Sequence, residues 1–368
     1  MSKPSSTHLL DAQTRSMTAL DLHEVFAPKT RHAYFGNIQQ VRLPNGLCME
    51  YALHGEDDAS DKVLLIMGMH AAKEAWLPIL STMLHPSSSG TNASIQLVTF
   101  DNRGVGNSDK PWGWYSTSQM AQDALLLLDH LQWSKAHVVG SSLGGMIAQE
   151  LALAAPGRVL SLALLVTTPG FRQGPMPGRA QTTAYLSLLQ SMVFPTHDRI
   201  ATTSLGTLFP HDYLQQKQGN GTSAYDILYK YHLTKLETSK TTLAGELGHY
   251  VAVLGHNVTE DRLTGLANSG LPIVVIGATQ DRLLHPDHST VLCKCLGDET
   301  EFFVLDDAGH DVHIQHRLEV SEALVKVFIR GRHSSNEVQS TPLLARVVLP
   351  SNGWSGAGAS KSKTRKRH

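Results

Sequence analysis

Short, nearly continuous apolar runs recur along the chain and alternate with segments of helical periodicity. The apolar runs lie at 62–68, 94–101, 135–141, 159–168, 272–278 and 301–307. Runs of this length without polar alternation are typical of strands buried on both faces, as in a parallel sheet. The amphipathic segments between and after them lie at 119–131, 144–155 and 319–329. This alternation predicts a doubly wound, mostly parallel α/β sheet.

A long interval between two of the strand runs does not follow this alternation. Residues 170–267 lack the buried runs and instead contain helix-compatible pieces, at 181–194, 224–236 and 242–255. We therefore predict a helical cap at 170–267, inserted between two parts of the α/β core at 35–169 and 268–332. Seven aromatic residues of the insertion are expected mostly to pack its own core: Tyr185, Phe194, Phe209, Tyr213, Tyr225, Tyr229 and Tyr231.

The two ends of the chain lack clear periodicity. Residues 1–34 predict a loosely ordered N-terminal lead-in, and residues 333–368 mix polar, glycine and short apolar pieces, which predicts a disordered basic C-terminal tail. Between them, at 35–55, two strand-like pieces flank Asn45-Gly46, a pair that favours a β-hairpin turn.

Charge and composition narrow the classes of partner. The formal net charge is −1 and 41% of the 368 residues are hydrophobic, which is enough for a substantial core. Five of the last eight residues are Lys or Arg, so the remainder of the chain is mildly acidic. Neither aromatic interleaving nor an amphipathic helix accompanies this basic end, so we interpret it as solvated and expect it to bind neither a nucleic acid nor a membrane surface.

Apolar segments and cysteines indicate the cellular compartment of the protein. No run reaches the ~18–20 apolar residues of a transmembrane segment, and the first residues lack the apolar stretch of a secretory signal. Three cysteines, two of them only two positions apart, suit a reducing compartment. We expect a cytoplasmic protein. Import into an organelle stays an alternative, although Asp11, Asp21 and Glu24 argue against a transit peptide.

The segment with the most chemical information is AHVVGSSLGGMIAQELAL at 136–153. A predicted strand passes through Gly140-Ser141-Ser142-Leu143-Gly144 directly into a predicted helix, which is a G-x-S-x-G pattern centred on Ser142. A strand that turns at once into a helix forces its central residue into a strained conformation that lifts the hydroxyl away from the sheet. Minimal side chains are needed two residues before and after it, at Gly140 and Gly144.

In this context the pattern resembles the nucleophile elbow of the α/β-hydrolase superfamily. The resemblance implies a triad in the chain order serine, acid, histidine. PIVVIGATQDRLLHP at 272–286 is a strand followed by Asp281, and EFFVLDDAGHDVHIQH at 301–316 is a strand followed by His310. We therefore expect Ser142 as nucleophile, His310 as base and Asp281 as the acid. Asp306 and Asp307 are the rival acids, at positions where a carboxylate more often serves a turn or cap.

The resemblance also implies an oxyanion hole. KVLLIMGMHAAKEAWLPIL at 62–80 is similar to the family's strand and loop that supply one backbone N–H, which would be that of Met69, paired with the N–H of Leu143. Many relatives have His-Gly where this chain has Met67-Gly68. The donor is a backbone group, so the hole is retained, but a side-chain bond that stiffens the loop is lost.

Two other patterns in the sequence resemble binding sites only in part. Gly104-Val105-Gly106 lacks the third glycine and the acidic partner of a dinucleotide loop, so no nucleotide cofactor is expected. The i, i+3, i+6 spacing of His310, His313 and His316 spreads the rings around a helix, so no metal is expected. His249, in the insertion, is expected on the helix surface or lining the pocket.

Together these features predict a cofactor-free serine esterase acting on a small-molecule carboxylic ester of small or medium size. Carbon–carbon bond hydrolysis and acylglycerol hydrolysis use the same triad and stay open as alternatives. A small-molecule receptor built on the same fold is the alternative from another class. Ser142 argues against the branches of the superfamily with an aspartate nucleophile.

Overall fold

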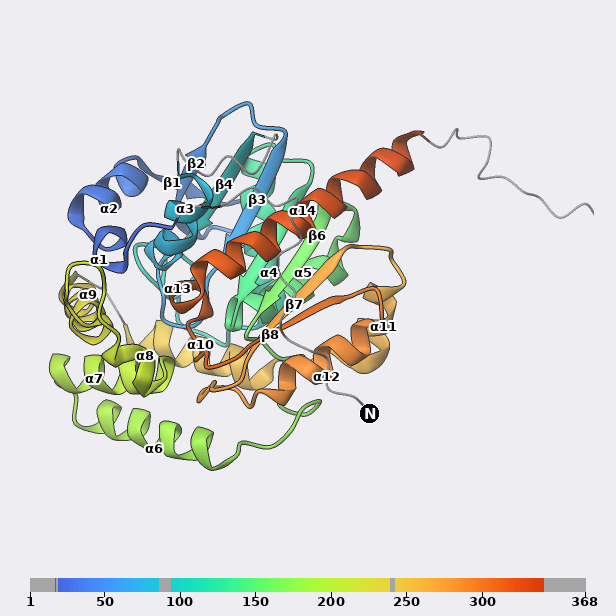
Figure 1. Ribbon diagram of the computed structural model, residues 1–368. Coiled ribbons are helices and arrows are strands. Elements are labelled where there is room, and N and C mark those ends of the chain that lie inside the picture. Colours follow the sequence, from blue (N-terminus) through green and yellow to red (C-terminus); the bar gives the residue numbers. More distant parts are fainter. Residues whose placement is uncertain (1–16, 18, 86–93, 239–241, 341–368) are drawn as a thin grey trace, which may run out of the picture.

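The computed structural model describes residues 17, 19–85, 94–238 and 242–340 (Figure 1). Eight strands form one sheet in the order β1-β2-β4-β3-β5-β6-β7-β8. The strands are β1 Ile38–Arg42, β2 Cys48–Gly55, β3 Asp61–Ile66, β4 Ile95–Phe100, β5 Ala136–Ser141, β6 Val159–Leu165, β7 Ile273–Ala278 and β8 Glu301–Leu305. From β4 to β8 neighbouring strands are parallel, and β2 joins β1 and β4 in antiparallel pairs. The predicted doubly wound, mostly parallel sheet is confirmed.

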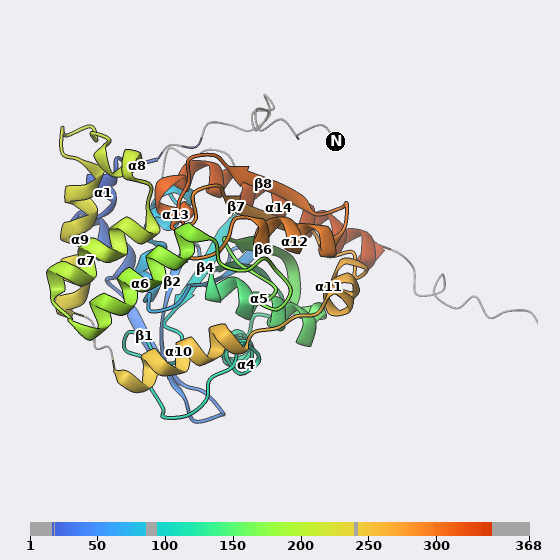
Figure 2. The same cartoon turned by 90° about the horizontal axis from the view of Figure 1, so that it is seen from below.

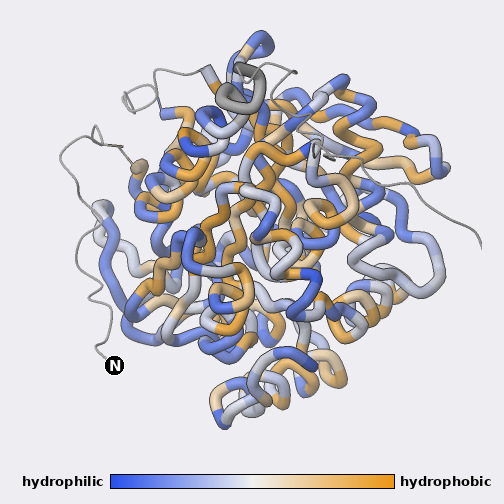
Figure 3. The backbone as a smooth tube through the Cα atoms, turned by 90° about the vertical axis from the view of Figure 1, so that its right-hand side faces the viewer, coloured by the Kyte–Doolittle hydropathy of each residue, from blue (hydrophilic) through white to orange (hydrophobic). Residues whose placement is uncertain are grey.

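The burial of each strand follows its place in the sheet. Every residue of β5 and β7 is buried, whereas β1 alternates between exposed and half-buried positions at the edge. The predicted hairpin is confirmed between β1 and β2, where Arg42 faces Cys48. Gly46 has a φ of +87° in its turn, a conformation that glycine adopts without a steric penalty. The tube in Figure 3 shows hydrophobic residues concentrated along the central strands.

Helices cover both faces of the sheet (Figure 1). Residues of α4, α5, α11 and α12 pack with one face in a single apolar cluster, and residues of α3 and α14 pack with the other. Ser116 starts α4 with a side-chain cap, its Oγ accepting a hydrogen bond from the Gln119 N–H at 3.1 Å. These helices are α3 Leu77–Met83, α4 Thr117–His130, α5 Leu143–Ala154, α11 Glu260–Ala267, α12 Asp287–Leu296 and α14 Arg317–Ser340.

A third group of helices lies between β6 and β7 in the chain. It comprises α6 Arg179–Val193, α7 His197–Leu208, α8 His211–Gln215, α9 Ala224–Thr238 and α10 Leu243–Gly255. Buried residues of α7, α8 and α9 form a separate apolar cluster with Leu22 and Ile314. Phe209 and Tyr213 belong to that cluster as expected, whereas Phe194 is 62% exposed. The last helix of the interval, α11, packs on the sheet side against α5 and α12.

The ends of the described chain are more ordered than we expect from the sequence. Within the expected lead-in, α1 Leu22–Val25 and α2 Pro28–Phe35 are helices, and Leu22 and Val25 are fully buried. Two apolar residues three positions apart are too short a pattern to indicate a helix by periodicity. At the other end α14 continues to Ser340, beyond the expected start of the tail. The rest of that tail, residues 341–368, lies outside the described residues.

Candidate active site

Ser142 occupies the junction between β5 and α5. Strand β5 ends at Ser141 and helix α5 begins at Leu143, so no loop separates them. Ser142 has φ 56° and ψ −121°, a conformation that costs a non-glycine residue ~1–3 kcal/mol. The conformation is held by the Ser142 N–H, which donates to the Leu165 carbonyl at 2.9 Å, and by Thr167 Oγ1, which donates to the Ser142 carbonyl at 2.7 Å.

Two glycines make this junction sterically possible. A β-carbon on Gly140 would lie 2.2 Å from the Gly144 carbonyl oxygen, and one on Gly144 would lie 2.0 Å from the Ile66 carbonyl oxygen. Both neighbours are backbone atoms, which cannot move aside without shifting the strand or the helix. Of the two adjacent serines, Ser141 is buried, whereas Ser142 is only half-buried. The turn therefore leaves the Ser142 side chain partly accessible to solvent, and it places the Ser142 backbone at the N-terminus of α5.

The structure brings His310 and Asp281 together. His310 Nδ1 lies 2.7 Å from Asp281 Oδ2, and both side chains are buried. An ionised carboxylate only accepts hydrogen bonds, so Nδ1 carries the proton and Nε2 is left as an acceptor. Asp281 Oδ1 accepts from the Leu283 and Leu284 N–H groups at 2.8 and 2.9 Å, which fixes the carboxylate in its turn.

Burial and the carboxylate act on His310 in opposite directions. Burial lowers the pKa of the imidazole, but the charge and the hydrogen bond of Asp281 outweigh it, so the pKa of His310 is raised above 6.5. The rival acids are placed elsewhere. Asp306 and Asp307 are both exposed, and Asp307 Oδ1 accepts a hydrogen bond from Gln280 Nε2 at 2.9 Å.

The three candidate residues lie at one edge of the sheet. Ser142 directly follows β5, Asp281 follows β7 and His310 follows β8. Because β5, β6, β7 and β8 are parallel neighbours in this order, their carboxyl ends meet at the same edge. In open α/β sheets this is the edge where sites are built.

The loop after β3 lies against Ser142. A β-carbon on Gly68 would be 3.1 Å from Ser142 Cβ and 3.6 Å from Ser142 Oγ. The N–H groups of Met69 and Leu143 donate no hydrogen bond to another of the described residues. Both therefore remain available as donors beside the serine, one on this loop and one at the start of α5.

Helix α10 supplies contacts to this loop that the sequence did not reveal. His249 is fully buried: its Nδ1 accepts from the His70 N–H at 3.2 Å, and its Nε2 lies 2.8 Å from the Arg103 carbonyl oxygen. Asn102 Nδ2 donates to the Met67 carbonyl at 2.9 Å and holds the other side of the loop. These bonds stiffen the loop without the His-Gly histidine that this chain lacks.

Two glycines of α10 allow this helix to pack closely against the neighbouring loop. A β-carbon on Gly245 would lie 2.1 Å from the Gly104 carbonyl oxygen, and one on Gly248 would lie 2.4 Å from the Tyr115 ring. Two glycines three positions apart in a helix indicate close approach to another backbone. That spacing is a signal from which the packing of α10 on the loop after β4 could have been predicted.

A cavity of about 900 Å³ adjoins the loop after β3. Its walls include His70, Gly104, Tyr231 and Lys235, which come from the loops after β3 and β4 and from α9. Burial lowers the pKa of His70 to about 3, helped by the nearby charges of His249 and Lys235, so this ring is neutral. The cavity is large enough for a small organic molecule.

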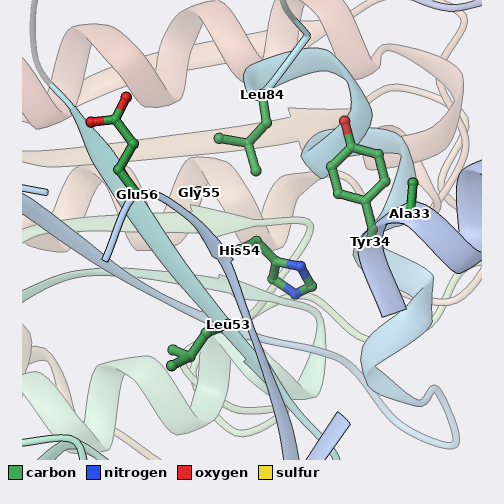
Figure 4. A pocket seen from close by; sticks show the side chains of 7 residues that line it. All are labelled: Ala33, Tyr34, Leu53, His54, Gly55, Glu56 and Leu84. Carbon is green, nitrogen blue, oxygen red and sulfur yellow. The ribbon is translucent and has the colours of Figure 1, made fainter. Parts of the chain in front are cut away.

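A second cavity, of about 420 Å³, is remote from these groups. Figure 4 shows Tyr34, His54 and Leu84 around it, between α2, β2 and the end of α3. His54 bonds to Thr99 Oγ1 at 2.9 Å, and burial lowers the pKa of this histidine to about 4. Neither cavity has Ser142, Asp281 or His310 among its lining residues, but the larger one borders the loop after β3 that lies against Ser142.

The described residues contain neither a metal-binding cluster nor a membrane-spanning helix. No cluster of three or more His, Cys, Asp or Glu side chains there could hold a metal ion; His313 instead packs its ring 5.6 Å from that of Trp76. None of the helices in the described part of the chain combines the length and apolar character that crossing a bilayer requires.

Comparisons with known proteins identify the family and agree with the fold. A family model described as alpha/beta hydrolase fold matches residues 62–317. The chain is 25% identical over 276 residues to BpoC of Mycobacterium tuberculosis, which is named as a non-heme bromoperoxidase; the match covers 75% of this chain and 96% of BpoC. A hydrolase from Pseudomonas aeruginosa superposes with a TM-score of 0.63 at 22% identity, covering 80% and 99% of the two chains. The enol-lactonase from Burkholderia xenovorans gives 0.62 at 20% identity, covering 79% and 100%.

Proposed function

The chain belongs to the alpha/beta hydrolase fold family, and from this premise we propose that it is a serine hydrolase that cleaves small or medium carboxylic esters through an acyl-enzyme on Ser142. The observation that carries the proposal is the buried 2.7 Å contact between His310 Nδ1 and Asp281 Oδ2. It lies at the sheet edge where the strained Ser142 directly follows β5. A nucleophile, a base and a group that orients the base are the parts that acyl transfer requires.

In the first half of the reaction, Ser142 attacks the ester carbonyl. His310 Nε2 takes the hydroxyl proton as the Oγ–carbonyl bond forms, because a neutral serine hydroxyl is a poor nucleophile. Asp281 stabilises the imidazolium without taking a proton itself. The imidazolium then donates that proton to the departing alkoxide, so the alcohol leaves and the acyl group stays on Ser142.

Negative charge develops on the carbonyl oxygen during the attack. The N–H groups of Met69 and Leu143 stand beside Ser142 without partners among the described residues, and we assign them to this oxyanion. Each such donor is worth ~3–4 kcal/mol in the transition state. The positive end of the α5 helix dipole also stabilises this negative charge, because Ser142 lies at the N-terminus of the helix.

In the second half, water repeats the attack on the acyl-enzyme. His310 removes a proton from the water, the tetrahedral intermediate collapses, and the proton returns to Ser142 as the carboxylic acid leaves. No cofactor takes part in either half.

Covalent labelling tests the proposal. We expect a fluorophosphonate probe to label the wild-type protein on Ser142, and Ser142→Ala to abolish labelling and lower ester turnover by about 10⁴-fold or more. Ser141→Ala is the matched control: that side chain is buried, so labelling should persist. Mass spectrometry of the labelled peptide identifies the serine. An adduct on Ser141, or many turnovers by Ser142→Ala, would overturn the assignment, and labelling without turnover of any ester would favour a receptor.

A further inference from the structure

The exposed hydrophobic side chains are concentrated on one part of the molecule. Among the described residues thirteen large hydrophobic side chains are exposed, and eleven of them lie in residues 112–114 and 176–254. We call these eleven the roof surface: Trp112, Trp114, Met176, Leu186, Leu189, Met192, Val193, Phe194, Leu243, Leu247 and Leu254. Single exposed hydrophobic residues are normal, but a gathering of this kind marks an interaction site.

The helices α6 and α10 make polar contacts with their inner faces and carry apolar residues on their outer faces. The inner face of α6 is tied to the acid loop, because Gln181 Nε2 donates to the Asp281 carbonyl at 2.7 Å and Tyr185 donates to the Leu283 carbonyl. The inner face of α10 is tied to the loop after β3 through His249. The outward faces of both helices therefore carry apolar residues where a helix facing only water would carry polar ones.

The roof surface is continuous across these elements. The Tyr250 hydroxyl of α10 lies 3.5 Å from Met192 Sδ at the end of α6. Tyr115, next to the two exposed tryptophans, packs on α10 at Gly248. Figure 2, which looks from below, shows α6 and α10 both crossing the face turned toward the viewer. One flat partner can therefore contact α6 and α10 together.

Few charged residues lie on the segments that carry the roof surface. On 112–114, 176–194 and 243–254 they are Arg179 and Glu246, and Arg172 lies shortly before α6; both arginines are exposed. Neither arginine makes a hydrogen bond or an ion pair with another of the described residues. Glu246 is the acidic residue of α10, and it is half-buried. Exposed arginines beside apolar side chains complement a surface that is apolar inside and anionic outside.

We propose that the roof surface docks the protein on a lipid surface with anionic headgroups. Trp112 and Trp114, which are 75% and 85% exposed, would lie at the level of the headgroups, where tryptophan side chains are favoured. Leu254 and Phe194, 72% and 62% exposed, would reach the acyl chains. Docking in this way turns the helices that cover the catalytic loops toward the lipid.

The charges favour a lipid surface over a second copy of the chain. A two-fold dimer through the roof surface would be self-complementary, so the same patch would face itself. It would enclose Arg172 and Arg179 of both copies in one interface, whereas phosphate headgroups would neutralise them.

Vesicle sedimentation with the full chain tests the proposal. The lipid probes are vesicles of phosphatidylcholine alone and of phosphatidylcholine with phosphatidylglycerol. We expect wild-type protein to sediment with the anionic vesicles, and Trp112→Ser/Trp114→Ser and Phe194→Ser/Leu254→Ser each to weaken partitioning by about tenfold. Arg172→Gln/Arg179→Gln should weaken it by about fivefold per arginine, and only on the anionic vesicles.

The chain offers a matched control. Ile38 and Val304, at 39% and 40% exposed, are the two exposed large hydrophobic residues of the described chain outside the roof surface. Ile38→Ser/Val304→Ser should leave partitioning unchanged. The basic residues 361–368 are present in every variant, so their contribution cancels in the comparison. Hydrolysis of a water-soluble short ester, measured in parallel, should stay constant and reports on Ser142 independently of docking.

Three results would overturn the inference. The first is a wild-type protein that sediments with neither kind of vesicle. The second is binding of the roof variants to vesicles as tightly as Ile38→Ser/Val304→Ser. The third is a wild-type dimer in analytical ultracentrifugation that the tryptophan and phenylalanine variants dissociate, which would make the roof surface an interface between copies.

Discussion

Replacing Asp281 with asparagine separates the two tasks that its side chain performs. One oxygen holds the turn by accepting from the Leu283 and Leu284 N–H groups, and the other accepts from His310 Nδ1. In Asp281→Asn, the amide oxygen can keep the two backbone bonds. The amide nitrogen then faces His310 and can only donate, so Nδ1 must become the acceptor. The ring proton moves to Nε2, the nitrogen that takes the proton of Ser142 in the proposed mechanism.

The expected loss of turnover follows from this exchange of tautomers. Placing an asparagine behind the catalytic histidine costs about 10⁴-fold in kcat, or ~5.4 kcal/mol at ~1.36 kcal/mol for each factor of ten. Stability should change little in Asp281→Asn, since the turn is kept. Asp281→Ala should lower both turnover and stability. The buried Leu284 N–H is then left without its acceptor, which lowers the free energy of unfolding by roughly 1–3 kcal/mol.

The assay compares three variants on a water-soluble p-nitrophenyl ester, with thermal unfolding followed by circular dichroism. Asp307→Asn is the control, because Asp307 is an exposed carboxylate close in sequence to His310 and bonded to Gln280. It should keep near-wild-type turnover. Turnover by Asp281→Asn within tenfold of wild type, together with a large loss in Asp307→Asn, would show that the rival acid orients the histidine and would refute this reasoning.

Two further predictions follow from the site geometry. Because the pKa of His310 is raised above 6.5 and the base must be neutral, kcat/KM should fall as the pH drops through a midpoint above 6.5; a midpoint below 6 in the pH–rate profile would contradict this. Gly144→Ala should lower the free energy of unfolding by ~1–3 kcal/mol and reduce turnover, because its β-carbon would lie 2.0 Å from the Ile66 carbonyl oxygen. The matched change Gly157→Ala, where no atom lies within 4 Å, should stay within ~0.5 kcal/mol of wild type in a denaturant titration.

Features that depend on adjacent residues could be predicted from the sequence. The apolar runs identified β3 to β8 as parallel strands, because burial on both faces removes polar alternation. The expected burial was wrong for β8, which lies at the sheet edge and is mostly half-buried. The Asn45-Gly46 turn identified the hairpin. The position of Ser142 between strand and helix could also be predicted, since the elbow lies within five consecutive residues and its two glycines serve that one turn.

Contacts between distant segments were decided only by the tertiary structure. The 2.7 Å contact of His310 with Asp281 joins residues 29 positions apart, and His249 meets the Arg103 carbonyl across 146 positions. The apolar outward faces of α6 and α10 were likewise decided only by the tertiary structure. Their hydrophobic residues suggested a packed cap, and only the arrangement of the helices left Phe194 and Leu254 exposed. Periodicity reports which residues share a face of one element, but which partner covers that face depends on the packing of the whole chain.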